Sequence, residues 1–97
     1  MGRAVTFIGA NDVPHCSGMV RRQGSTNVFV NGIGVSRQGD VNTKHKKPPF
    51  PCPPHAQPIA IGSLTVKVNG RGCGRVGDAI TACTSVAQGS PNVFAGG

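Results

Sequence analysis

An internal repeat constrains this chain more than any other feature. Residues 24–40 read GSTNVFVNGIGVSRQGD and residues 62–78 read GSLTVKVNGRGCGRVGD; they align without a gap, and 10 of 17 residues are identical. Residues 89–97 (GSPNVFAGG) match the first half of this unit, and residues 7–15 (FIGANDVPH) resemble its second half. Similarity at a fixed period is typical of folds built from equivalent units. The sequence therefore predicts three units with pseudo-threefold symmetry, one of them split between the two ends of the chain.

Each unit has the pattern of a short β-hairpin. Valines alternate with other residues at 28 and 30 and again at 66 and 68, which is the period of a half-buried strand. Asn31-Gly32 and Asn69-Gly70 follow at once, and Asn-Gly is a strong signal for a two-residue hairpin turn. We therefore expect an all-β fold of short hairpins without a helix, in a single domain spanning residues 1–97.

Composition restricts the classes of function. The net charge of +7 suggests an anionic partner. The basic residues are scattered, however, and lack the interleaved aromatic residues of single-strand-binding proteins. We expect a solvated basic surface and no nucleic-acid partner. There is no Glu, and Asp40 and Asp78 occupy equivalent turn positions, where a carboxylate typically bonds to the backbone. We therefore expect no enzymatic activity and no small-molecule substrate.

The apolar content is too thin for a large core, because the chain has no Trp, no Tyr and a single Leu. Small domains of this kind usually require a disulfide, a metal or a partner. No signal peptide or membrane-spanning run is evident, so we expect folding in the cytoplasm, where cysteines more often bind metals than form disulfides.

The repeat places three metal-binding residue types at one structural position. Six residues after the equivalent glycines at 9, 39 and 77 come His15, His45 and Cys83. Residues at equivalent positions near a threefold axis lie close to one another, so we expect these three to meet. The remaining histidine, His55, ends the proline-rich stretch KHKKPPFPCPPH at residues 44–55. Three imidazoles and one thiolate form a tetrahedral set suited to Zn²⁺. The sequence predicts one structural zinc per chain, bound by His15, His45, His55 and Cys83.

The stretch Lys46–Pro54 is then a stiff strap that returns a fourth ligand to the metal, and we expect it at the narrow end of the molecule. Cys52 is an alternative to Cys83 as the thiolate ligand, because Cys52 and His55 have the C-x-x-H spacing of many zinc sites. Cys16 adjoins His15 and is expected to point away from the metal. Cys73 is expected to pack as a small apolar residue.

Units of the form G-S-x-x-V-x-V-N-G, followed by R-x-G-D and then a His or Cys, resemble the PAAR-repeat proteins over nearly the whole chain. The resemblance is greatest to the small spike-tip members of T4-like contractile-tailed bacteriophages. It implies a cone that caps the trimeric β-helical spike of a phage tail or a type VI secretion system. It also implies a zinc near the apex, which by motif position is bound by His15, His45, His55 and Cys83. This sequence departs from the family pattern at the Pro-Ala-Ala-Arg element, which reads GVSR at 34–37 and GCGR at 72–75.

The expected function is therefore that of a structural spike tip used in envelope piercing. The expected partner is a homotrimeric β-helical spike protein with one tip per trimer, and contact with the target cell envelope is transient. The expected location is the tip of a phage tail in the virion, after assembly in the host cytoplasm, or outside the cell after type VI secretion. The alternative is a zinc-stabilised basic binding module for nucleic acid or anionic glycolipid.

Overall fold

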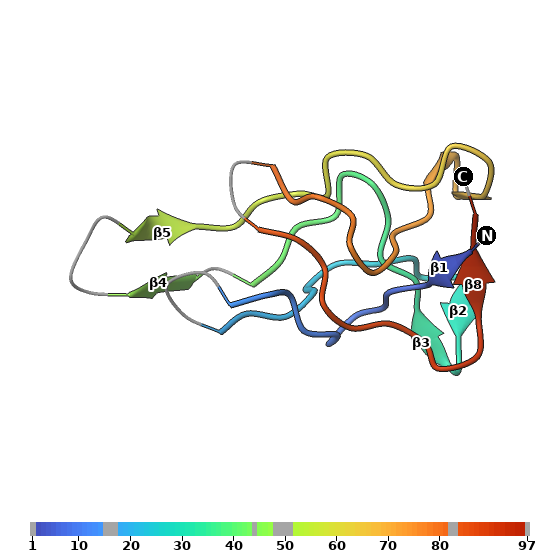
Figure 1. The fold of residues 1–97 in the computed structure, drawn as a ribbon, viewed down its shortest axis with the longest axis horizontal. Coiled ribbons are helices and arrows are strands. Elements are labelled where there is room, and N and C mark those ends of the chain that lie inside the picture. Colours follow the sequence, from blue (N-terminus) through green and yellow to red (C-terminus); the bar gives the residue numbers. More distant parts are fainter. Residues whose placement is uncertain (1, 15–17, 44, 48–51, 82–83, 97) are drawn as a thin grey trace.

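The computed structural model describes residues 2–14, 18–43, 45–47, 52–81 and 84–96, with 45–47 and 52–55 described by their backbone alone. The described residues form short antiparallel strand pairs and contain no helix, as predicted (Figure 1). The long axis of the molecule measures 39 Å and the two short axes measure 23 Å each, which fits a symmetry axis along its length. The strands are β1 (Arg3–Ala4), β2 (Phe29–Val30), β3 (Ile33–Gly34), β4 (His45–Lys47), β5 (Cys52–His55), β6 (Lys67–Val68), β7 (Arg71–Gly72) and β8 (Phe94–Ala95).

Two hairpins follow the Asn-Gly signals in the sequence. β2 pairs with β3 around Asn31-Gly32, and β6 pairs with β7 around Asn69-Gly70. All four turn residues have positive φ angles, between 50° and 81°. A two-residue turn with two positive φ angles is the type I′ turn, whose twist matches that of the flanking strands.

The third strand pair, equivalent in position to the two hairpins, joins the two ends of the chain. β1 pairs with β8 in antiparallel register, with Arg3 opposite Ala95 and Ala4 opposite Phe94. Both termini lie beside this pair at the wide end (Figure 1). The split repeat unit predicted from the sequence is therefore confirmed. The residues that follow β1, β3 and β7 pair with neighbouring units, in the Val5–Arg75, Phe7–Val35 and Arg37–Cys73 bridges, so these strands stay short.

A closed ring of backbone hydrogen bonds lies where the three units meet. The N–H of Thr6 donates to the carbonyl of Gly74 (3.0 Å), the N–H of Gly74 to that of Ser36 (2.9 Å), and the N–H of Ser36 to that of Thr6 (3.2 Å). All three residues are buried. Each occupies the same position in its unit, so the bonds run in one sense around the axis. We call these residues the axial ring.

The apolar core consists of small clusters rather than one large mass. On the side of the hairpins, two threefold sets pack together: Val30, Val68 and Ala95, with Val5, Val35 and Cys73. A second cluster contains Ile59, Ile80 and Val86. The thin core expected from the composition is thus arranged around the axis.

The Gly-Ser pair that opens each unit holds the chain close to its own hairpin. Ser25, Ser63 and Ser90 are buried, and each hydroxyl accepts an N–H from the residue three positions later, at 2.8, 2.9 and 3.0 Å. A Cβ on the preceding glycine would lie within 2.9 Å of at least one backbone carbonyl oxygen in each of the three units. Glycine at this position therefore permits the close backbone contact.

The Arg-x-Gly-Asp sequences form ion-paired turns, as expected for Asp40 and Asp78. Asp40 accepts the backbone N–H of Arg37 at 2.8 Å and pairs with its guanidinium through two bonds. Asp78 makes the same three contacts with Arg75. A second arginine from a neighbouring unit reaches each carboxylate, since Arg3 lies 2.8 Å from Asp78 and Arg71 lies 3.4 Å from Asp40. The turns therefore also join the units.

We predict that Gly74→Ala destabilises the fold by about 1–3 kcal/mol. The added Cβ would lie 2.5 Å from the carbonyl oxygen of Ser36 and 2.9 Å from Cγ2 of Thr6, so the axial ring must open. Gly96→Ala is the control, because a Cβ there meets nothing within 4 Å and the φ angle is not positive. Urea or thermal unfolding measures both variants. Equal stability of the two would contradict a central role for the ring.

We also predict that Asp78→Asn costs about 3 kcal/mol, because it leaves the buried guanidinium of Arg75 without its counter-charge. Arg3→Gln removes the second partner of Asp78 but should cost less than about 1 kcal/mol, because the Arg3 side chain is 46% exposed. Chemical denaturation measures the loss of unfolding free energy in each variant. A larger loss for Arg3→Gln would contradict the view that Arg75 is the more important partner of Asp78.

Candidate metal centre

The four predicted zinc ligands lie largely outside the described part of the chain. His15 and Cys83 are not among the described residues, and His45 and His55 are described by their backbone alone. Among the side chains that the structure does describe, no three His, Cys, Asp or Glu residues come together. The structure does describe the segments that lead to these residues.

The β4–β5 hairpin corresponds to the predicted strap. Its strands are antiparallel, His45 stands directly opposite His55, and Lys47 stands opposite Cys52, with an irregularity in register between the two pairs. The hairpin lies at the end of the molecule opposite the two termini (Figure 1). At its base, Asn42 donates its N–H to the carbonyl of Gln57 (3.2 Å) and accepts the N–H of Gln57 on its side chain (3.0 Å). β4 and β5 therefore lie at the narrow end, as predicted for the strap (Figure 1); residues 48–51 lie outside the described residues, and the position of the strap over a metal stays a prediction.

A second ring of hydrogen bonds surrounds the roots of the three segments that carry the predicted ligands. Three equivalent N–H groups donate across unit boundaries: Val13 to the carbonyl of Ser85 (2.9 Å), Thr43 to that of Val20 (2.8 Å) and Thr81 to that of Pro58 (2.9 Å). The donors stand two residues before His15, His45 and Cys83. We call these three bonds the root ring. The segments leading to the three repeat-related ligands thus start from equivalent points around the axis.

Two threonine side chains reinforce the root ring. The hydroxyl of Thr43 accepts the N–H of Val20 at 3.2 Å, and the hydroxyl of Thr84 donates to the carbonyl of Val13 at 3.0 Å. Pro58, at the third position, has no N–H to donate in return. Sequence reasoning missed these residues, because Thr43 stands two residues before His45 whereas Thr84 stands one residue after Cys83, so the two share no position in the repeat.

A buried ion pair lies in the layer next to the root ring. Asp12 and Arg21 both have fully buried side chains, and Oδ1 of Asp12 lies 3.4 Å from Nε of Arg21. Asp12, Asn42 and Ile80 occupy equivalent positions, and all three are buried. Sequence reasoning placed Arg21 among the scattered charges of a solvated surface, and this was wrong. Charge alone does not reveal burial, because nothing in the local sequence pattern indicates that Arg21 pairs with Asp12.

Cys73 takes no part in the candidate centre. It is buried in the apolar cluster of the hairpins and forms no disulfide. Burial raises the pKa of its thiol to about 11, despite the opposing effect of the nearby Arg75 charge. The thiol is therefore protonated at neutral pH, and Cys73 packs as a small apolar residue, as predicted. Cys16 lies outside the described residues, and only the backbone of Cys52 is described.

Comparison with known proteins identifies the family. The family profile of the PAAR motif matches residues 10–83, a range that contains all three histidines and ends at Cys83. A search of curated proteins gave no significant match. PAAR-motif proteins are in general structural proteins that sit on spike proteins, which fits a role other than catalysis. The match covers well over half of the chain, and this protein therefore belongs to the PAAR-motif family.

Proposed function

We propose that this protein is a spike tip that caps a homotrimeric β-helical spike, with one tip per trimer, in a phage contractile tail or a type VI secretion system. The observation that carries the proposal is the arrangement of three equivalent strand pairs, two hairpins and the β1–β8 pair, around one axis. Val28, Val66 and Val93 precede the three hairpins and are 37, 40 and 40% exposed. A single chain thus presents nearly the same surface three times, as a trimeric partner requires.

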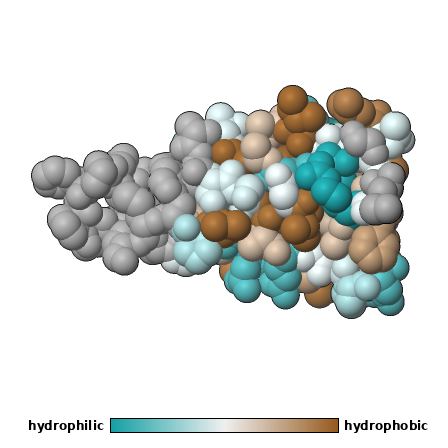
Figure 2. Space-filling model, in the orientation of Figure 1, coloured by the Kyte–Doolittle hydropathy of each residue, from teal (hydrophilic) through white to brown (hydrophobic). Residues whose placement is uncertain are grey.

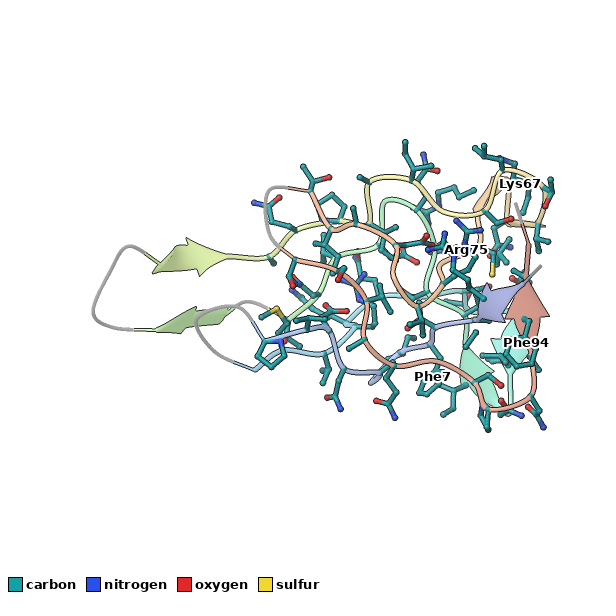
Figure 3. The ribbon with its side chains drawn as sticks, viewed as in Figure 1. Phe7, Lys67, Arg75 and Phe94 are labelled. Carbon is teal, nitrogen blue, oxygen red and sulfur yellow. The ribbon has the colours of Figure 1, made fainter. Side chains whose placement is uncertain are left out.

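The wide end also carries two strongly exposed aromatic residues. Phe29 and Phe94, which are equivalent, are each 59% exposed, and Lys67 takes the third position. Figure 3 shows Phe94 and Lys67 at this end, with Arg75 inside the molecule. Exposed apolar patches on small soluble proteins commonly mark interaction sites. The end of a β-helix leaves strand edges that need covering, and the hairpin end of the tip suits that purpose.

We further propose that His15, His45, His55 and Cys83 bind one structural zinc at the narrow end. The root ring and the cross-strand register of His45 and His55 support this proposal, because residues opposite each other in an antiparallel pair share a face of the sheet. A closed zinc site would supply folding free energy that the thin core lacks. The narrow end is then the part that contacts the target envelope. The tip would be carried on the virion tail or secreted through the type VI system.

Purified protein is predicted to contain one zinc per chain by elemental analysis, and chelation should lower its unfolding temperature. Cys83→Ser should lose the metal and much of the stability, whereas Cys52→Ser should retain both. Loss of metal from Cys52→Ser alone would transfer the thiolate ligand to Cys52. Protein free of metal and insensitive to chelators would refute the site.

Native mass spectrometry of the tip mixed with its spike protein is predicted to show one tip and three spike chains. Phe29→Glu should abolish the complex because it places a charge in the apolar contact, and Ile61→Gln, on the flank, should leave the complex intact. Moderate salt should weaken the complex little, whereas a nucleic-acid complex would lose affinity by orders of magnitude. A three-to-three complex, or salt-sensitive DNA binding without spike binding, would favour the basic binding module.

A further inference from the structure

Asparagine side chains tie the strand pairs of the wide end to one another. The carboxamide of Asn31, in the turn between β2 and β3, donates to Oδ1 of Asn92 in the split unit at 3.0 Å. The carboxamide of Asn69, in the turn between β6 and β7, donates to Oδ1 of Asn27 in the unit of β2 and β3 at 2.9 Å. We call these two bonds the asparagine clamps. Each joins a hairpin turn to the segment that precedes a strand in a neighbouring unit.

Each turn asparagine is also held at its carbonyl oxygen. Oδ1 of Asn69 accepts a bond from the guanidinium of Arg37 at 3.0 Å, and Oδ1 of Asn31 accepts the hydroxyl of Ser90 at 2.6 Å. Both donors belong to a neighbouring unit. The amide nitrogen and the oxygen of each turn side chain therefore have partners in another unit, so the turn is fixed relative to that unit.

The third boundary between units has a different contact. Gly96 takes the turn position there, and its backbone carbonyl accepts the hydroxyl of Ser63 and the guanidinium of Arg75. Thr65 is equivalent to Asn27 and Asn92, and its described side-chain contact stays within its own unit. Among the described residues, the asparagine clamps thus occur at two boundaries of the three.

The clamps coincide with the exposed aromatic residues of the wide end. The sequence Asn-Val-Phe occurs at 27–29 and at 92–94, whereas Thr-Val-Lys occupies 65–67. Phe29 and Phe94 each stand two residues after a clamped asparagine, and the unit without a clamped asparagine at this position carries Lys67. Figure 2 shows polar residues interspersed with apolar ones over the wide part of the molecule. Because a two-stranded hairpin alone is only marginally stable, its position depends on contacts with its neighbours.

We propose that Asn27 and Asn92 are positioning residues for spike binding, which hold Phe29 and Phe94 in place before the spike is bound. This inference rests on the proposed function. A partner that binds a preformed surface does not have to order it, so affinity rises without any new contact. The clamped asparagines are exposed, so their bonds contribute little to global stability. Their loss would instead free the segment next to each aromatic residue.

The test measures affinity for the purified spike trimer by calorimetry and backbone order by ¹⁵N relaxation of the full chain. The double variant Asn27→Ala/Asn92→Ala should bind about tenfold more weakly and show lower order at the amides of Phe29 and Phe94. Its unfolding temperature should fall by no more than about 5 °C. Asn27→Asp/Asn92→Asp should restore affinity and order, because a carboxylate oxygen accepts the same amide. Thr65→Ala is the matched control and should change neither.

A variant on the other side of one clamp tests the bond itself. Asn69→Gly permits the positive φ angle of the turn and removes the amide donor. Its loss of affinity should add little to that of Asn27→Ala, because both variants break the same bond.

Unchanged affinity in the double alanine variant, or a loss that the aspartates do not restore, would overturn the proposal. Weaker binding with unchanged order would make the two asparagines direct contacts of the spike, and this would overturn it as well. A wild-type chain that binds no spike trimer would refute the proposed function and this inference together, whereas the other outcomes leave the proposed function standing.

Discussion

The axial ring is the interaction on which the rest of the structure depends. Its bonds join residues as far apart as Thr6 and Gly74, so no unit can complete its backbone hydrogen bonding without the other two. A buried N–H or carbonyl left unpaired costs about 1–3 kcal/mol, and the ring satisfies three of each in a space too narrow for side chains at Gly74. The hairpins and the root ring follow from this arrangement, because each continues the chain outward from a ring residue.

The backbone follows the threefold symmetry, whereas the side chains at equivalent positions differ. At the Arg-x-Gly-Asp turns two units use ion pairs, whereas the split unit has Phe7 and Ala10 in the same places. In the layer near the root ring the pattern is reversed, since the split unit supplies the buried Asp12 where another unit has Ile80. Equivalent backbone bonds thus tolerate either ionic or apolar contacts, provided that each buried charge has a partner.

The repeat allowed much of the fold to be predicted, because equal sequences at equal spacing adopt equal structures. The two turns could be predicted locally, because they require positive φ angles, which Asn31-Gly32 and Asn69-Gly70 readily adopt. The inter-unit bonds were not predictable, since they join residues far apart in the sequence. Burial of Arg21 was not predictable either, because the local pattern does not show that it pairs with Asp12. The same repeat led to the predicted ligand set of His15, His45, His55 and Cys83. The structure adds that the segments leading to the three repeat-related ligands start from equivalent points around the axis, and that His45 stands opposite His55.

A slender molecule of short strands faces a mechanical problem if it is loaded along its axis. Two-residue strands and small apolar clusters resist sliding poorly, and axial compression would splay the units apart. The axial ring and the root ring run around the axis, so splaying must stretch their hydrogen bonds directly. Under the proposed function, a zinc that ties all three units together would add a third and stronger closure at the narrow end, where the units taper and the core has least to contribute.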